Sequence, residues 1–179
     1  MTVVDPRTVV NPAQARQLLD TVPKVGCKRG ARLKALFACV YYAALCCEEA
    51  ADLRQRSCTL PEWGWGLLIL ERARPQGTKR WTNNGQTHKS RQLKHRADKE
   101  TREIPIPPVL AAILREHIEA YDVAKDGRLF RTETGGFYSS SAYSYVWQEA
   151  RRLALTPAQV SSSLAARRTT CGTLRSRSG

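Results

Sequence analysis

Hydrophobic residues recur at helical spacing in three long stretches of the chain. In the most regular one, residues 33–44, they fall three and four positions apart, which predicts a buried helix. The same spacing predicts helices at 107–121 and from about 141 to 153, the last with Leu153 on its apolar face. Asn11 before Pro12, and Thr156 before Pro157, are helix-start signals. Shorter helices are therefore expected at 11–21, at 48–53 and from 156 onward.

Two stretches between these helices favour strands. Residues 66–74 are mostly apolar and lie between turn signals, and residues 101–107 alternate polar with apolar residues. Prolines cannot donate to a β-ladder, so 101–107 suits an edge strand. The expected fold class is α+β, mainly helical, with a small antiparallel sheet and a basic hairpin. The expected organisation is a linker at 1–10, one domain at 11–164 and a disordered basic tail at 165–179.

Charge adds a partner to this picture. The chain has 29 Lys and Arg against 16 Asp and Glu, a net charge of +13. Between Glu71 and Arg102 there are ten Lys or Arg and three acids, so this segment alone carries +7. A solvated surface loop is the simpler interpretation, but so long a run of one sign favours phosphate contacts through counterion release. The residues expected to contact DNA are Lys89, Arg91, Lys94, Arg96, Lys99, Arg102 and Arg54.

Other chemistry is sparse. The longest apolar run, 35–47, has 13 residues and is too short for a membrane span. The six cysteines form no C-x-x-C pair and have no histidine at ligand spacing, so we expect reduced thiols in a cytoplasmic protein, no metal and no cofactor. His117 lies on an apolar helix face and is interpreted as a core residue. Trp63, Trp65 and Trp81, which flank a strand, are interpreted as packing residues, with stacking on bases as the alternative.

Three segments together resemble a known family. The segments LFACVYYAALCCEEAADLR (36–54), LKHRADKETREIPIPPVLAAILREHI (93–118) and GRLFRTETGGFYSSSAYSYVWQEAR (127–151) are similar to the catalytic domain of tyrosine recombinases, or phage integrases, of the actinobacterial type. The resemblance implies the catalytic-core fold of DNA breaking-rejoining enzymes and a double-stranded DNA partner, with no small-molecule substrate. Such enzymes join DNA to a tyrosine while arginines and a hairpin lysine stabilise the charge that develops on the phosphate.

The resemblance assigns candidate roles to a few residues. Cys46 occupies the position of the family's first arginine, and a thiol offers neither a fixed charge nor a bidentate fork. Glu49 matches the supporting acid, although a helix N-terminal charge is an equal alternative. Lys94 best matches the hairpin general acid and Lys99 is the second candidate, while both could be ordinary phosphate contacts. Arg54 matches an arginine with a structural or DNA-backbone role.

The end of the sequence departs from the family pattern. After Leu164 the second arginine motif and the tyrosine nucleophile are absent, and the chain reads AARRTTCGTLRSRSG. One inserted base after a codon for Arg167 allows the family-like reading RPYDLRH, which suggests a frameshifted, pseudogene-like product of a phage or mobile element. The resemblance also implies a helical DNA-clamping domain ahead of this region, whereas only a ten-residue stretch expected to be a linker precedes Asn11 in this sequence.

Three functions remain open. The first is an integrase-like protein for DNA recombination and integration that binds DNA and is catalytically inactive. The second is a non-enzymatic basic nucleic-acid-binding protein or recombination inhibitor, including one that assembles with an intact recombinase. The third is a redox or metal protein, for which adjacent Cys46 and Cys47 are the sole support.

Overall fold

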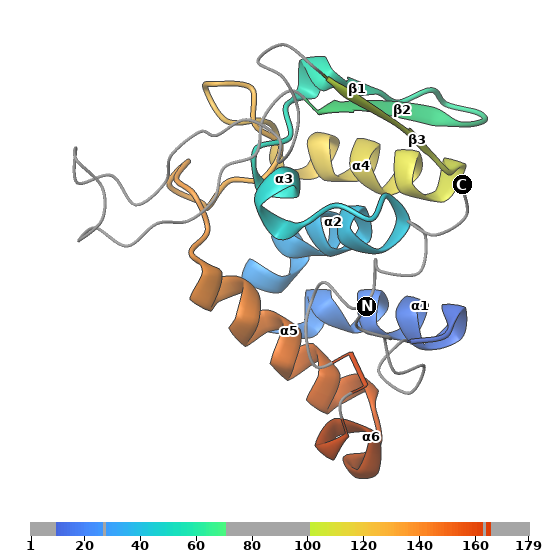
Figure 1. Ribbon diagram of the computed structural model, residues 1–179. Helices are drawn as coiled ribbons and strands as arrows, with labels where there is room; N and C mark the ends of the chain where they lie inside the picture. Colours follow the sequence, from blue (N-terminus) through green and yellow to red (C-terminus); the bar gives the residue numbers. More distant parts are fainter. Residues whose placement is uncertain (1–9, 27, 71–100, 163, 166–179) are drawn as a thin grey trace.

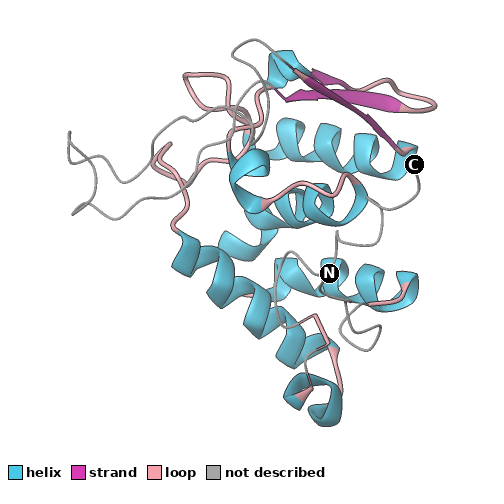
Figure 2. Cartoon of the chain, in the orientation of Figure 1, coloured by secondary structure: helices cyan, strands magenta, loops and turns pink. Residues whose placement is uncertain are grey.

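The computed structural model describes residues 10–26, 28–70, 101–162 and 164–165. The elements follow in the order α1 (Pro12–Thr21), η2 (Val22–Lys24), α2 (Arg29–Tyr42), α3 (Cys47–Ala51), η3 (Gln55–Ser57), β1 (Cys58–Thr59), β2 (Gly66–Leu70), β3 (Arg102–Ile106), α4 (Pro108–Tyr121), α5 (Ser140–Ala154) and α6 (Pro157–Ser161). One small three-stranded sheet lies at the edge of a mainly helical structure, which confirms the expected α+β class (Figure 2).

The helix α2 is the centre of the core. It packs against α1, α3, α4 and α5, and its apolar residues from Leu33 to Val40 are buried. The chain enters it through a close approach: Gly30 donates its N–H to the carbonyl of Val25, and a Cβ on Gly30 would lie 2.1 Å from the carbonyl oxygen of Val22. Only glycine fits there without a shift of backbone.

The sheet lies beside α4, in the order β1-β2-β3 with both pairings antiparallel (Figure 1). Along β2, Gly66, Leu68 and Leu70 are buried and the two residues between them are less so, as expected when one face covers a core. Pro105 of β3 pairs with Leu67 and is exposed. The strand β3 is an edge strand among the described residues, as its prolines predicted.

Local capping signals explain several helix starts. Asn11 and Gln14 exchange side-chain to backbone hydrogen bonds of 2.8 and 3.0 Å at the start of α1. Thr156 and Gln159 make the same reciprocal capping box at α6. Such boxes satisfy N–H groups that a helix leaves without partners. The predicted starts at 11 and 156 are therefore confirmed.

A buried arginine joins the last described residues to α5. Arg151 donates from Nε and Nη2 to the carbonyl of Leu164, at 3.0 and 2.7 Å, and from Nη2 to the carbonyls of Val160 and Ser162. Trp147 donates from its indole N–H to the carbonyl of Ala165 at 2.8 Å. Val10 and Ala165, which flank the expected domain at 11–164, are both buried.

Three hydrophobic side chains lie where the pattern did not place them. Trp63 and Trp65 are 86% and 62% exposed, so their interpretation as packing residues was wrong. They lie in the connection between β1 and β2, where Arg115 bonds the carbonyl of Pro61 and no helix covers the indoles. Leu153 is also exposed, although Ala150, Arg151 and Ala154 of the same helix are buried, so Leu153 lies outside the buried face of α5.

Candidate nucleic-acid interface

Cys46 caps the N-terminus of α3. Its Sγ accepts a hydrogen bond from the N–H of Glu49 at 3.4 Å, and its own N–H donates to Oε2 of Glu49 at 2.9 Å. Burial raises the pKa of Cys46 to about 12, so the thiol is neutral near pH 7. The position that the resemblance assigns to an arginine therefore holds an uncharged capping group.

Glu49 also binds a cation from the sheet. Its Oε2 lies 3.3 Å from Nη2 of Arg102, which is on β3. The Glu49 side chain is only 13% exposed, whereas that of Arg102 is 35% exposed. Glu49 and Arg102, both singled out from the sequence, thus form an ion pair between α3 and β3. The Glu49 carboxylate that binds Arg102 is also the one that caps the start of α3.

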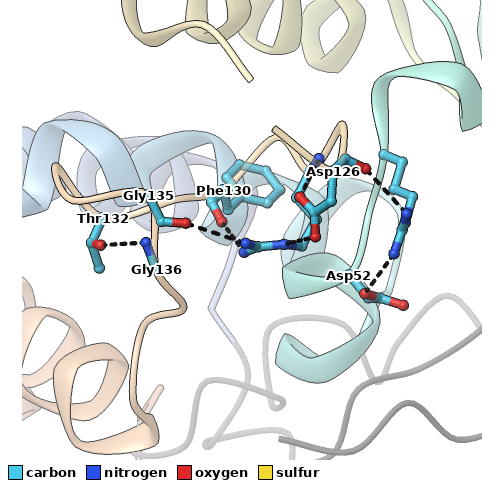
Figure 3. A network of polar contacts seen from close by, with 8 residues as sticks. Asp52, Asp126, Phe130, Thr132, Gly135 and Gly136 are labelled. Carbon is cyan, nitrogen blue, oxygen red and sulfur yellow. Dashed lines mark hydrogen bonds and ion pairs between the residues drawn. The ribbon is translucent and has the colours of Figure 1, made fainter. Parts of the chain in front are cut away.

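Arg54 links the segment after α3 to a distant loop. Its Nη1 donates to the carbonyl of Asp126 at 3.1 Å, and its Nη2 lies 4.0 Å from Oδ1 of Asp52 (Figure 3). The backbone supports this link through an isolated bridge between Arg54 and Arg128 and a hydrogen bond from the N–H of Leu129 to the carbonyl of Leu53. Arg54 therefore holds the segment after α3 against the loop that contains Asp126, and its side chain remains 29% exposed.

Arg128 fixes the shape of that loop. It is buried, and its guanidinium binds Oδ2 of Asp126 at 2.7 Å and the carbonyls of Phe130 and Gly135 (Figure 3). It also lies 3.5 Å from the ring centroid of Phe137. Although burial acts to raise it, hydrogen bonding from Arg128 lowers the pKa of Asp126. The sequence analysis gave no role to Arg128, because its partners come from both sides of a turn.

Five of the predicted DNA contacts fall outside the described residues: Lys89, Arg91, Lys94, Arg96 and Lys99. Both candidates for the hairpin general acid are among them. The structure does place the two ends of this segment, at Leu70 of β2 and Arg102 of β3, which are paired in the sheet. A cavity of about 100 Å³ beside them is lined by Glu49, Asp52, Leu53, Arg54, Arg56, Ser57, Ile69 and Leu70.

A second basic surface was missed by the sequence analysis. Lys28, Arg29 and Arg32 line a groove of about 860 Å³ together with residues of α5 and of the loop before it. The sequence signal for this surface is the cluster KRGAR at 28–32, which is much shorter than the basic segment at 71–102 and was not singled out. Its partners lie more than 100 residues further along the chain.

The histidine on α4 is a core residue, as predicted. His117 is buried, its Nε2 lies 3.1 Å from the carbonyl oxygen of Leu129, and burial lowers its pKa. Among the described residues, no group of three His, Cys, Asp or Glu could hold a metal ion. In the same parts of the chain, every helix is too short or too polar to cross a bilayer.

Comparisons with known proteins identify the fold. No protein-family model and no curated protein sequence matches the chain. Among solved structures, the Tn1549 transposon integrase in complex with transposon right end DNA superposes with a TM-score of 0.68 at 15% identity, over 95% of this chain and 52% of that one. XerH site-specific recombinase bound to difH substrate gives 0.57 at 18% identity, over 91% and 40%. XerA recombinase gives 0.57 at 11% identity, over 89% and 49%.

This chain spans about half the length of the structures it resembles. Over 89–95% of its own length, this chain superposes on the helices and strands of those structures. The described part of the chain has the fold of a tyrosine recombinase catalytic domain.

Proposed function

We propose that this chain is an integrase-like protein of DNA recombination and integration, which binds duplex DNA without cutting it. The observation that carries the proposal is that the +7 segment at 71–102 follows Leu70 of β2 directly and ends at Arg102 of β3, which is paired with Leu70 in the sheet and bound to Glu49. Solved structures with this fold include DNA complexes of the Tn1549 integrase and XerH. Counterion release from the phosphate backbone supplies the affinity.

Loss of catalysis follows from Cys46. In phosphoryl transfer through this fold, a guanidinium at that position would bind the scissile phosphate and stabilise its developing charge. The Cys46 thiol is neutral and its Sγ accepts a hydrogen bond from the N–H of Glu49, so it supplies no positive charge and no bidentate pair of donors. Arg102 lies near, but its guanidinium is shared with the carboxylate of Glu49. Within the proposal, Lys94 and Lys99 act as phosphate contacts rather than as general acids.

The redox or metal alternative is disfavoured by the same thiols. Burial raises the pKa of Cys58 to about 12 and also raises that of Cys39, as it does for Cys46. A thiolate is the form that attacks disulfides and binds metals. These cysteines are therefore poor candidates for either reaction.

The test measures the binding of a fluorescent duplex over a range of salt concentrations. The double variant Lys94→Gln/Lys99→Gln should reduce the slope of log Kobs against log salt by about 2, because each phosphate contact contributes roughly 0.9. The control is Lys24→Gln/Lys125→Gln, which removes the same charge from other surfaces. Equal salt slopes for the two double variants would show that Lys94 and Lys99 do not contact DNA, and would contradict the proposal.

Two further measurements separate the remaining possibilities. Incubation with a nicked suicide duplex should give no covalent protein–DNA adduct, and an adduct would overturn the proposed inactivity. If the chain acts as an inhibitor by assembly with an intact recombinase, it should lower recombination when the DNA is already in excess. Inhibition that disappears in excess DNA indicates competition for the site alone.

A further inference from the structure

A large groove separates the start of α2 from the start of α5. It encloses about 860 Å³ and is lined by Val25, Gly26, Lys28, Arg29, Arg32, Thr132, Glu133, Thr134, Phe137, Tyr138, Ser139, Ala142, Tyr145 and Val146. We call it the α2–α5 groove. It borders the loop that the Arg128 network holds, and this loop lies on the same side of the molecule as α3 (Figures 1 and 3).

The groove is electropositive. Three cations, Lys28, Arg29 and Arg32, line it against one acid, Glu133, which leaves an excess of two positive charges. Glu133 forms an ion pair with Lys28 at 3.2 Å, and both side chains are more than half exposed. Exposed pairs of this kind contribute little, so an incoming anion can replace it. Lys28 and Arg29 are themselves exposed at the start of α2.

Arg32 is held at the floor of the groove without using all its donors. Its guanidinium lies 4.6 Å from the ring centroid of Tyr121, which fixes its position by a cation–π contact. Within the described residues, its Nε and Nη1 are buried and have no hydrogen-bond partner. Its charge is thus not cancelled by a carboxylate in this part of the chain, and it adds to the potential of the groove.

The other wall offers hydroxyl groups and an aromatic ring. Ser139 lines it and its hydroxyl also accepts a hydrogen bond from the N–H of Ala142, Tyr138 lines it with a mostly buried side chain, and Tyr145 of α5 is exposed. Cations combined with hydroxyl donors are the usual partners of phosphate and sugar oxygens, and an exposed ring can stack on a base or pack on a sugar. The volume is well above that of an inorganic ion, which favours an extended polyanion.

We propose that the α2–α5 groove binds a stretch of DNA sugar–phosphate backbone, as a contact separate from the basic segment at 71–102. This proposal rests on DNA binding as the proposed function and adds a second place where the chain holds DNA. An acidic protein segment is the competing occupant. Solved structures with this fold include DNA complexes, and the excess of positive charge in the groove matches a phosphate backbone, which favours DNA.

The test neutralises the two exposed cations. Lys28→Gln/Arg29→Gln should weaken binding of a random-sequence 20-base-pair duplex at least about tenfold near 0.1 M salt and reduce the salt slope by about 2. Arg16→Gln/Lys24→Gln removes two exposed cations of α1 and η2 outside the groove and should change affinity less than about threefold. Arg32 is kept, because its contact with Tyr121 supports packing. Thermal unfolding of each variant shows that the fold is retained.

Four results discriminate the alternatives. Equal affinities for the groove variant and its control overturn the groove proposal; if Lys94→Gln/Lys99→Gln still weakens binding, the proposed function stands without it. A wild-type chain that binds no DNA overturns both proposals. A groove variant that loses a fluorescent poly-glutamate peptide but keeps DNA assigns the groove to a protein partner and overturns the proposal. A parallel titration with a single-stranded 20-mer shows which form of backbone the groove holds, because the groove variant weakens the preferred form more.

The wild-type chain gives a second measurement. Acetylation of Lys28 by a water-soluble ester should slow severalfold when duplex DNA is bound, while acetylation of Lys24 should not change. Unchanged reactivity of Lys28 in the complex contradicts the proposal, even if the glutamine variants bind weakly.

Discussion

Replacement of Arg151 tests how the end of the described chain is held. In Arg151→Met, the carbonyls of Leu164, Val160 and Ser162 lose their donor, and so does the Gln148 side chain. A buried acceptor left without a partner costs about 1–3 kcal/mol. Methionine no longer requires a buried charge to be desolvated, which offsets part of the loss. We expect a net loss of about 3 kcal/mol in the free energy of unfolding.

The assay is thermal unfolding followed by circular dichroism. For a chain of this size each kcal/mol shifts Tm by about 2–4 °C, so Arg151→Met should melt roughly 6–12 °C below wild type. The matched control is Arg152→Met on the same helix, where the side chain is 66% exposed and pairs with Glu149. Such a pair is worth less than about 1 kcal/mol. If both variants melt within about 2 °C of each other, the bonds from Arg151 do not stabilise the fold and the reasoning is wrong.

Three other changes test separate features. Ala44 has φ of 53°, so Ala44→Gly should raise the free energy of unfolding in urea by about 1 kcal/mol, whereas Ala43→Gly, with φ of −105°, should lower it. Gly30→Ala brings a Cβ within 2.1 Å of the Val22 carbonyl and should lower the same quantity by about 1–3 kcal/mol; a neutral result means that the approach is looser than described. Burial lowers the pKa of His117 on folding from its ordinary value of about 6.5, so the unfolded chain binds its proton more readily. Its contribution is present above pH 6.5 and is lost as the pH falls, so stability should decline less between pH 7.5 and 5.5 in His117→Asn than in wild type.

The sequence predicted what depends on neighbours along the chain. The capping boxes at Asn11 and Thr156 use partners three residues away, and Pro105 marks an edge strand by its chemistry alone. The sequence could not place Trp63, because its burial depends on whether a distant element covers it. Arg151 was missed for the same reason: its charge predicts a surface, and its partners lie in another segment.

The candidate interface follows the same division. Cys46 and Glu49 were found because they lie three positions apart in one motif, and their pairing is local. The contact of Glu49 with Arg102 spans 53 positions, and no periodicity encodes it. The α2–α5 groove joins residues near 30 to residues near 140, so it exists only once both helices have packed on the core.

The packing of α1 against α5 has a consequence for synthesis. Gln17 donates its side-chain N–H to the carbonyl of Ala154 at 2.6 Å, across 137 positions. Ribosomes add about 5–20 residues per second, so α1 emerges roughly 7–27 s before its partner exists. During that interval Leu18 and Leu19, which are buried in the finished protein, have only the contacts of α1 with η2 and α2 available. The interface between α1 and α5 therefore closes late in synthesis, although one of its two helices is made early.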